Sequence, residues 1–495
     1  MRYVGALDQG TTSSRFMIFD ESGHVIASAQ EEHTQILPQA GWVEHDALEI
    51  WLKVTNVITA ALKSAGLAGK DLSAIGITNQ RETTVAWDGT TGKPLYNAIV
   101  WQDTRGQVVL DTFTDAQKSF ITHKTGLAIA PYFSGSKISW LLRNVPEVAK
   151  AARAGTLKIG TIDSWLVWNL TKNVHITDVT NASRTLLMDL ESLAWDLELL
   201  EIFGVSAQSL PSIKSSSEIY AHTNIDGVFG AEVPIAGILG DQHAAMVGQL
   251  CFERGDTKCT YGTGNFALVN TGTEIVRSTQ GLLTTVCFKF GDEPARYALE
   301  GSVAVTGSAV QWLRDQLGII HQASEIEALA ASVPDNGGVY FVPAFSGLFA
   351  PYWRSDARGV LVGLTRAATR AHIARATLEA IAYQTKDVID AMADETGVKL
   401  KELRVDGGIT SNNLCMQIQS DILQIDLSRP VVSETTALGA AYAAGLAVGI
   451  WPNIEALGKQ WKESARWSPA DGSALATTGY KNWKRAIERT LNWVE

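Results

Sequence analysis

The stretch ALDQGTTSSRFMIFDESGHVIAS, residues 6–28, alternates short apolar runs with turn residues. Apolar runs separated by QGTTSSR and ESGH are typical of antiparallel strands joined by tight turns. The first turn carries an acid, Asp8, then a glycine, four hydroxyl side chains and Arg15. Backbone N–H groups beside a glycine approach phosphate oxygens closely, and hydroxyls and an arginine add donors. The stretch therefore predicts an antiparallel meander whose first turn holds an anion, although a polar turn without a ligand explains these residues equally well.

Three later stretches show a related pattern. Residues 233–250, VPIAGILGDQHAAMVGQL, predict an apolar strand that ends in Gly-Asp before a helix. Residues 255–272, GDTKCTYGTGNFALVNTG, predict a hairpin with a Gly-Thr-Gly turn. LRVDGGITSNN, residues 403–413, predicts a late strand and a turn that opens a helix.

An acid at a strand end beside glycine thus occurs once in each half of the pattern, as Asp8 and as Asp241. This repeat indicates two similar α/β halves that face a cleft. We expect the boundary near residue 252, which divides the chain into residues 1–252 and residues 253–495.

The bulk composition narrows the class of protein. A chain of 495 residues is too long for one hydrophobic core. Its net charge of −11 argues against a sequence-independent grip on nucleic acid or on an anionic membrane, because either needs a concentrated basic face. The four cysteines have no Cys-x-x-Cys spacing, and the N-terminal residues lack the apolar core of a signal peptide. We therefore expect a cytoplasmic protein without a nucleic-acid partner.

Residues 435–454, TTALGAAYAAGLAVGIWPNI, carry no charge and are nearly long enough to span a bilayer. Small residues dominate the stretch, and Pro452 closes it. We expect a helix buried between other elements and no membrane insertion.

Familiar nucleotide-binding motifs are absent or incomplete. The sequence has no G-x-x-x-x-G-K-[ST] phosphate loop. Residues 262–267, GTGNFA, match G-x-G-x-x-A, but strand-like residues follow where a dinucleotide-binding fold needs a helix. A phosphate-binding turn at residues 262–267 remains consistent with the sequence. Gly307 and Gln311 share one face of an expected helix, which either lines a nucleotide pocket or is simply buried.

Asp241 lies at a strand end before a helix, where its carboxylate can accept the proton of a hydroxyl that attacks a γ-phosphate. The alternative is a helix N-cap, a position that aspartate commonly fills. His243 has no partner at a spacing typical of a proton relay, so we interpret it as structural. Asp8 is suited to Mg²⁺ bound through water, because that ion keeps much of its hydration shell.

Arg81 and Glu82 form an adjacent donor and acceptor in a loop between two expected strands. Such a pair binds neighbouring hydroxyls of a polyol, or else it is an exposed ion pair of little energetic value. Trp101 and Tyr132 offer faces that suit the C–H side of a small polyol, or else they belong to the core.

Ten motifs follow one another over nearly the whole chain: DQGTTSSR, GITNQRET, NAIVWQDTR, PYFSGSK, TNASRTLL, GDQHAA, YGTGNF, GLLTT, APYW and RVDGG…NN. In this order they resemble the FGGY carbohydrate kinases, and NQRET is similar to the members that phosphorylate glycerol. The resemblance implies two ribonuclease-H-like domains of the actin, hexokinase and Hsp70 superfamily that flank an active-site cleft. It implies that residues 1–252 bind glycerol and phosphate and that residues 253–495 bind the nucleotide. It also implies transfer of the γ-phosphate of ATP to glycerol with Mg²⁺, the first step of glycerol catabolism, and a homodimer or homotetramer.

The resemblance further implies roles for single residues. The family's glycerol contacts fall on Arg81, Glu82, Trp101, Tyr132, Asp241, Gln242 and Phe266, with Asp241 as the catalytic base. Its nucleotide contacts fall on Thr11, Thr12, Ser13, Arg15, Thr263, Gly307, Gln311, Gly408 and Asn412. The metal is expected near Asp8 and Asp241.

Two other functions remain open at this point. One is a different FGGY sugar or polyol kinase, which NQRET and Trp101 argue against. The other is a non-catalytic sugar-sensing protein on the same fold, which would be free to lose Asp8 or Asp241.

Residues 224–233, NIDGVFGAEV, depart from some bacterial members of the family. Members inhibited by fructose 1,6-bisphosphate carry a glycine-rich loop with basic side chains there, whereas this loop has two acids and no base. We expect weak or absent inhibition by that bisphosphate.

Overall fold

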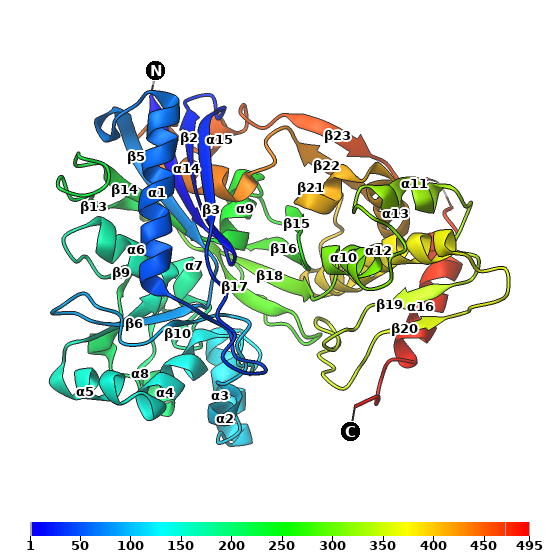
Figure 1. The fold of residues 1–495 in the computed structure, drawn as a ribbon, viewed down its shortest axis with the longest axis horizontal. Helices are drawn as coiled ribbons and strands as arrows, with labels where there is room; N and C mark the ends of the chain where they lie inside the picture. The colour runs from blue at the N-terminus through cyan, green and yellow to red at the C-terminus, as the bar shows by residue number, and fades with distance from the viewer. Residues whose placement is uncertain (1, 471, 495) are drawn as a thin grey trace.

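The computed structural model describes residues 2–470 and 472–494, and its chain forms two lobes (Figure 1). The first lobe is built on a six-stranded sheet in the order β13-β14-β5-β1-β2-β3. Its strands are β1 (Tyr3–Gln9), β2 (Ser13–Asp20), β3 (Val25–Glu32), β5 (Leu72–Asn79), β13 (Ser217–His222) and β14 (Pro234–Gly240). β1 pairs antiparallel with β2, and β2 pairs antiparallel with β3, so the predicted meander is confirmed.

The second lobe is built on a seven-stranded sheet in the order β17-β18-β16-β15-β21-β22-β23. Its strands are β15 (Thr257–Tyr261), β16 (Asn265–Gly272), β17 (Leu283–Phe288), β18 (Arg296–Val303), β21 (Glu402–Asp406), β22 (Asp426–Pro430) and β23 (Glu463–Trp467). The predicted hairpin at residues 255–272 is the antiparallel pair β15 and β16.

The two sheets share one topology. In each, a first strand (β1 or β15) pairs antiparallel with the next strand and parallel with a much later one (β5 or β21). That later strand pairs parallel with a further strand (β14 or β22), which an antiparallel edge strand completes. The predicted repeat of two similar α/β halves is therefore a repeat of strand order.

Asp8 and Asp241, the two acids that suggested the repeat, do not occupy equivalent positions in its two copies. β14, which leads into Asp241, pairs with β5 and belongs to the same sheet as β1, which carries Asp8. The second copy starts after Asp241, at β15. The expectation of one such acid in each half was wrong because an apolar strand pattern does not say which sheet the strand joins.

Helices cover both sheets. α1 (Ala47–Ala65) packs on β2 and β3 and is capped by the Asp46 side chain. α12 (Arg370–Thr396) and α13 (Asn413–Leu423) pack together in the second lobe. The other helices of more than eight residues are α3 (Asp115–Thr125), α4 (Ser134–Asn144), α5 (Pro146–Ala154), α6 (Ile162–Leu170), α10 (Gly307–Asp315), α14 (Thr435–Ala447) and α16 (Tyr480–Glu488).

A small sheet in the order β4-β7-β6-β8 extends the first lobe. It consists of β4 (Glu44–His45), β6 (Thr84–Asp88), β7 (Ala98–Ile99) and β8 (Leu157–Thr161). Since β5 ends at Asn79 and β6 begins at Thr84, Arg81 and Glu82 lie in the turn between them, as the sequence predicts.

α14 returns from the late part of the chain to the first lobe, where it lies in orange beside the blue strands (Figure 1). It packs against β5, β14 and α9 (Asp241–Gly248). A Cβ added at Gly439 of α14 would lie 1.8 Å from the Ala244 carbonyl oxygen, and one at Gly248 would lie 2.0 Å from that of Thr435. The two helices therefore meet backbone to backbone, which only glycine allows at these positions.

α14 is the uncharged segment that the sequence predicts to be a buried helix, and most of its residues are buried. Within residues 2–470 and 472–494, no helix combines the length and the apolar character that a membrane span requires. The domain boundary near residue 252 stays a prediction, and α14 shows that one cut does not separate the lobes.

Candidate active site

The opening turn is held tightly between β1 and β2. Gly10 N–H donates to the Ser13 carbonyl at 3.0 Å, and Trp101 Nε1 donates to Thr11 Oγ1 at 3.0 Å. The backbone carbonyl of Thr12 accepts a hydrogen bond from His33 N–H, and Ser13 Oγ accepts one from Gln30 Nε2. The turn expected to hold phosphate is thus bonded directly to one of the expected acceptor-site aromatics.

Arg15 lies opposite Asp8 in the register of β1 and β2. Its guanidinium pairs with Glu434, which precedes α14, and with Gln30 Oε1. Burial raises the pKa of the Asp8 carboxyl to about 6, an effect that the charge of Arg15 opposes and the charge of Asp241 increases. Asp8 and Asp241 therefore lie close enough to interact.

Asp241 is the first residue of α9, and Gly240 occupies the cap position. The helix-cap alternative does not describe Asp241, whose Oδ1 bonds only the adjacent Gln242 N–H at that helix end. Its side chain is 32% exposed, and Arg81 Nε lies 3.1 Å from its Oδ1. Burial raises the pKa of the Asp241 carboxyl, against the charge of Arg81. A partly exposed carboxylate with a raised pKa suits a general base.

Arg81 and Glu82 belong to a buried charge network, so the exposed ion-pair alternative is wrong for them. The network consists of Arg81, Glu82, Arg184 and Glu300, whose side chains are at most 2% exposed. Arg81 donates Nη1 to Glu300 Oε2 at 2.5 Å and Nη2 to Glu300 Oε1 at 3.1 Å. Arg184 donates Nε to Glu82 Oε1 at 2.7 Å and Nη2 to Glu300 Oε1 at 3.0 Å.

The backbone at Glu82 is strained, with φ of 59°, in the left-handed region that is uncommon for residues other than glycine. Ser134 Oγ donates to the Glu82 carbonyl at 3.0 Å. This bond ties the turn to the PYFSGSK segment, whose Tyr132 packs edge to face with Trp101, with ring centroids 5.4 Å apart. The expected polyol-binding pair and the expected aromatic wall therefore form one unit.

Gln242 and Phe266 both contact Lys258, a buried lysine of β15. Lys258 Nζ donates to Gln242 Oε1 and to Thr260 Oγ1, and it lies 3.5 Å from the Phe266 carbonyl. Burial lowers the pKa of Lys258. Because the ammonium binds the amide oxygen of Gln242, that side chain has its NH₂ group left as a donor toward other partners.

The expected nucleotide residues of the second lobe gather at the end of β15. Gly307, which opens α10, donates N–H to the Gly262 carbonyl at 3.0 Å, and Ser308 N–H donates to the Thr263 carbonyl at 3.1 Å. A Cβ at Gly307 would lie 2.6 Å from the Gly262 oxygen, so this close approach requires glycine. Gln311, one turn further along α10, is exposed.

The turn after β21 meets the same strand end. Gly407 has φ of 91°, and a Cβ there would lie 2.3 Å from the Tyr261 carbonyl oxygen. Gly408, which follows, is exposed, and a Cβ on it would meet nothing within 4 Å. Asn412 caps α13 through its Oδ1, which accepts Cys415 N–H at 2.8 Å. This structural role of Asn412 is one that the sequence reasoning did not include.

Asp8 and Asp241 supply the carboxylate oxygens that Mg²⁺ prefers. In the described part of the chain, no group of three or more His, Cys, Asp or Glu side chains is placed to hold a metal ion. Two carboxylates fit an ion that keeps several waters and binds substrate phosphates. Burial raises both carboxyl pKa values, so a cation there would favour their charged forms.

Three residues of the site were missed by reasoning from the sequence: Arg184, Glu300 and Lys258. Arg184 stands inside the quoted motif TNASRTLL, and Glu300 is a lone acid in the apolar strand run YALEGSVAV. A single charge inside a buried strand requires a partner, which is the signal that was available. Only the fold shows that its partners come from the other lobe.

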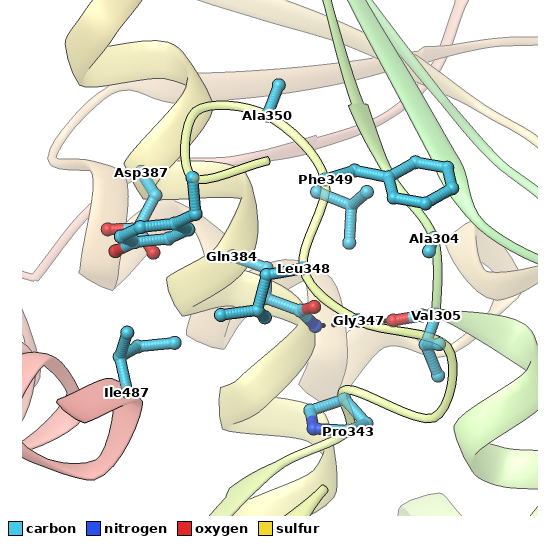
Figure 2. Close-up of a pocket in the computed structure, with 12 residues that line it drawn as sticks. Ala304, Val305, Pro343, Gly347, Leu348, Phe349, Ala350, Gln384, Asp387 and Ile487 are labelled. Atoms are coloured by element: carbon cyan, nitrogen blue, oxygen red, sulfur yellow. Dashed lines mark hydrogen bonds between the residues drawn. The ribbon is translucent and has the colours of Figure 1, made fainter. Parts of the chain in front are cut away.

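A cavity of about 10 Å³ lies in the second lobe between α12, α16 and residues 343–352 (Figure 2). Gln384 points across it and donates Nε2 to the Val305 carbonyl at 3.2 Å, while Leu348 points into its centre. A space of this size holds at most about one water molecule. It contains none of the expected site residues and is a feature of core packing.

Comparisons with known proteins agree with this geometry. The family model described as "FGGY family of carbohydrate kinases, N-terminal domain" matches residues 3–248, and the corresponding C-terminal domain model matches residues 257–448. A glycerol kinase of Mycobacterium tuberculosis is 59% identical over 500 residues, which cover 100% of this chain and 97% of that protein. Glycerol kinase 1 of Streptomyces coelicolor is also 59% identical, over 100% of this chain and 99% of that protein.

Solved structures show the same relation. The crystal structure of Plasmodium falciparum glycerol kinase with ADP is 41% identical, covers 99% of this chain and 98% of its own, and has a TM-score of 0.93. A xylulose kinase from Lactobacillus acidophilus, 21% identical with a TM-score of 0.87 over 99% of this chain and 98% of its own, shares the fold. The chain belongs to the FGGY family of carbohydrate kinases.

Proposed function

We propose that this chain is an enzyme that transfers the γ-phosphate of ATP to glycerol, giving sn-glycerol 3-phosphate and ADP. The observation that carries the proposal is the partly exposed Asp241 carboxylate beside Arg81, on the same wall as Glu82, Trp101 and Tyr132. The full-length similarity to proteins named glycerol kinase, one of them solved with ADP, supports this acceptor and this nucleotide.

In the proposed reaction, the Asp241 carboxylate accepts the proton of the attacking glycerol hydroxyl. Arg81 and Glu82 bind the neighbouring hydroxyls as donor and acceptor, and Trp101, Tyr132 and Phe266 limit the size of the acceptor. The Gln242 amide, oriented by Lys258, adds a donor. Alignment of the reacting groups supplies much of the rate enhancement in phosphoryl transfer.

The nucleotide is assigned to both lobes. Thr11, Thr12, Ser13 and Arg15 would hold its phosphates from the first lobe. Those that would hold it from the second lobe are Thr263, Gly307, Gln311, Gly408 and Asn412. Mg²⁺, held by Asp8 and Asp241 through water, would supply charge neutralisation on the phosphates. A cytoplasmic location and a homodimer or homotetramer complete the proposal.

Release of ADP from ATP, measured with and without glycerol, tests the function. Glycerol is expected to raise the rate of ADP release, and sn-glycerol 3-phosphate should accumulate in equal amount. A higher rate with xylulose or gluconate would assign the chain to another acceptor in the family. No acceptor-dependent release with any polyol would leave the non-catalytic sugar-sensing alternative.

The acceptor site is expected to discriminate against 1,2-propanediol, which lacks one glycerol hydroxyl. That substrate would leave a buried charged group in the Arg81 and Glu82 pair without its partner. We expect kcat/KM for the diol to be lower at least about tenfold than for glycerol. Steady-state kinetics with both substrates measure this ratio, and equal values would contradict the assignment of these side chains.

Fructose 1,6-bisphosphate is expected to inhibit the enzyme weakly or not at all. In the loop at residues 224–233, Asp226 and Glu232 are exposed and there is no basic side chain to hold a phosphate. An acidic loop repels a bisphosphate. Initial rates at increasing bisphosphate concentration check this, and inhibition below about 1 mM, an affinity that needs clear attraction, would refute it.

A further inference from the structure

We propose that Glu300 and Arg184 are positioning residues that set the acceptor specificity of the site, through Arg81 and Glu82. This inference rests on the proposed function and names residues that act on substrate only through their neighbours. Glu300 comes from β18 in the second lobe, whereas Arg81, Glu82 and Arg184 come from the first.

The contacts give each expected substrate side chain one fixed orientation. Both Glu300 oxygens receive the two terminal nitrogens of Arg81, which leaves Arg81 Nε directed at Asp241 at 3.1 Å. Arg184 holds Glu82 Oε1 at 2.7 Å with its Nε while its Nη2 binds Glu300. Paired, charge-assisted bonds of this kind fix planar groups in direction as well as in distance.

Burial and charge show that this arrangement is not a loose surface network. Glu300 and Arg184 are fully buried, and Phe133 lies over the Arg184 guanidinium at 5.3 Å. Although burial alone raises the pKa of Glu300, the charges of Arg184 and Arg81 hold that pKa well below its usual range. Glu300 is therefore ionised and supplies a full negative charge to two guanidiniums.

The charge network also helps to hold the strained backbone at Glu82. With φ of 59°, the Glu82 backbone persists only where its surroundings hold it. Arg184 binds the side chain and Ser134 binds the carbonyl. Loss of the Arg184 contact would free the Glu82 carboxylate to rotate away from the acceptor.

The test compares Glu300→Gln and the more conservative Glu300→Asp with the unmodified enzyme. Glu300→Gln is expected to raise KM for glycerol at least about tenfold, because charge-assisted bonds to Arg81 are lost, while KM for ATP changes less than about twofold. The preference for glycerol over 1,2-propanediol should fall by a similar factor. Glu300→Asp, which keeps the charge but draws it back by one methylene, should show the same changes to a smaller extent.

Asp387→Asn is the matched control. Asp387 is a buried carboxylate of α12 in the second lobe, bonded to Trp483 Nε1 at 2.9 Å and to Tyr480 Oη at 2.6 Å. Its loss should lower the melting temperature and leave the ratio of the two acceptors unchanged. A merely structural role for Glu300 would give that same pattern.

The outcomes separate this inference from the proposed function. If the unmodified enzyme phosphorylates glycerol and either folded Glu300 variant keeps its glycerol KM and its acceptor ratio, the positioning role is overturned and the function stands. If the unmodified enzyme shows no glycerol-dependent ADP release, both are overturned. Reduced discrimination in a folded Glu300 variant, with Asp387→Asn unaffected, supports the role.

Discussion

Replacing Asp241 with asparagine is expected to lower kcat at least about a hundredfold, the lower end for a positioned general base. The amide keeps the shape of the side chain and its contact with the Gln242 N–H, but it does not accept a proton from glycerol. ATP affinity should change far less than kcat, because Asp8 and the expected nucleotide residues, which belong to other segments, still hold the metal and the phosphates. Single-turnover measurements of sn-glycerol 3-phosphate formation give the chemical step directly.

Asp163→Asn provides the control for this substitution. Asp163 is a buried aspartate of α6 that accepts bonds from Thr161 and Thr177, and burial raises its pKa to about 7. It resembles Asp241 in chemistry but lies outside the site, so its variant should keep a kcat near that of the unmodified enzyme. Near-normal turnover of Asp241→Asn would rule out Asp241 as the base.

Gly439→Ala is expected to give the largest loss of stability from a single methyl group. The new Cβ would start 1.8 Å from the Ala244 carbonyl oxygen, which is backbone and has little freedom to move. Separating α14 from α9 costs on the order of 1–3 kcal/mol or more, as overpacking in cores does. Because α9 begins with Asp241, kcat should fall as well. Thermal unfolding and steady-state kinetics measure the two effects.

Gly10→Ala serves as the stability control. A Cβ at Gly10 would meet only the Ser13 carbonyl oxygen, at 3.5 Å, an ordinary contact. Its unfolding temperature should equal or slightly exceed that of the unmodified protein, since alanine restricts the unfolded chain. An unchanged melting temperature for Gly439→Ala would show that the contact between α9 and α14 yields without cost.

Much of the fold could be predicted from local sequence. The meander of β1 to β3, the turn that holds Arg81 and Glu82 and the β14–α9 junction all follow from apolar runs and turn residues within about twenty positions. Resemblance supplied the site residues of the second lobe, whose local patterns are weak. The placement of Asp8 and Asp241 in different halves of the repeat was wrong, because strand pairing depends on partners far along the chain.

The buried charge network could not be predicted in the same way. Adjacent Arg81 and Glu82 are consistent with an exposed ion pair. No residue near them in the sequence indicates that they form ion pairs with residues 184 and 300. A charged side chain is buried at low cost only when oppositely charged partners surround it. Whether Arg81 and Glu82 are buried therefore depends on how the two lobes come together. The burial of Lys258 was also not predictable from its neighbours in the sequence, because its ammonium binds Gln242 of a different element, α9.

The return of α14 to the first lobe also constrains how the protein is made. Gly76 of β5 and Gly237 of β14 lie against the α14 backbone, where an added Cβ would approach Ala440 O at 2.1 Å and Ala444 N at 2.6 Å. During synthesis, the sheet that carries Asp8 is not covered by α14 until residue 447 has left the ribosome. The first lobe to begin folding is therefore among the last to be completed, and the nascent chain exposes an apolar sheet face in the meantime.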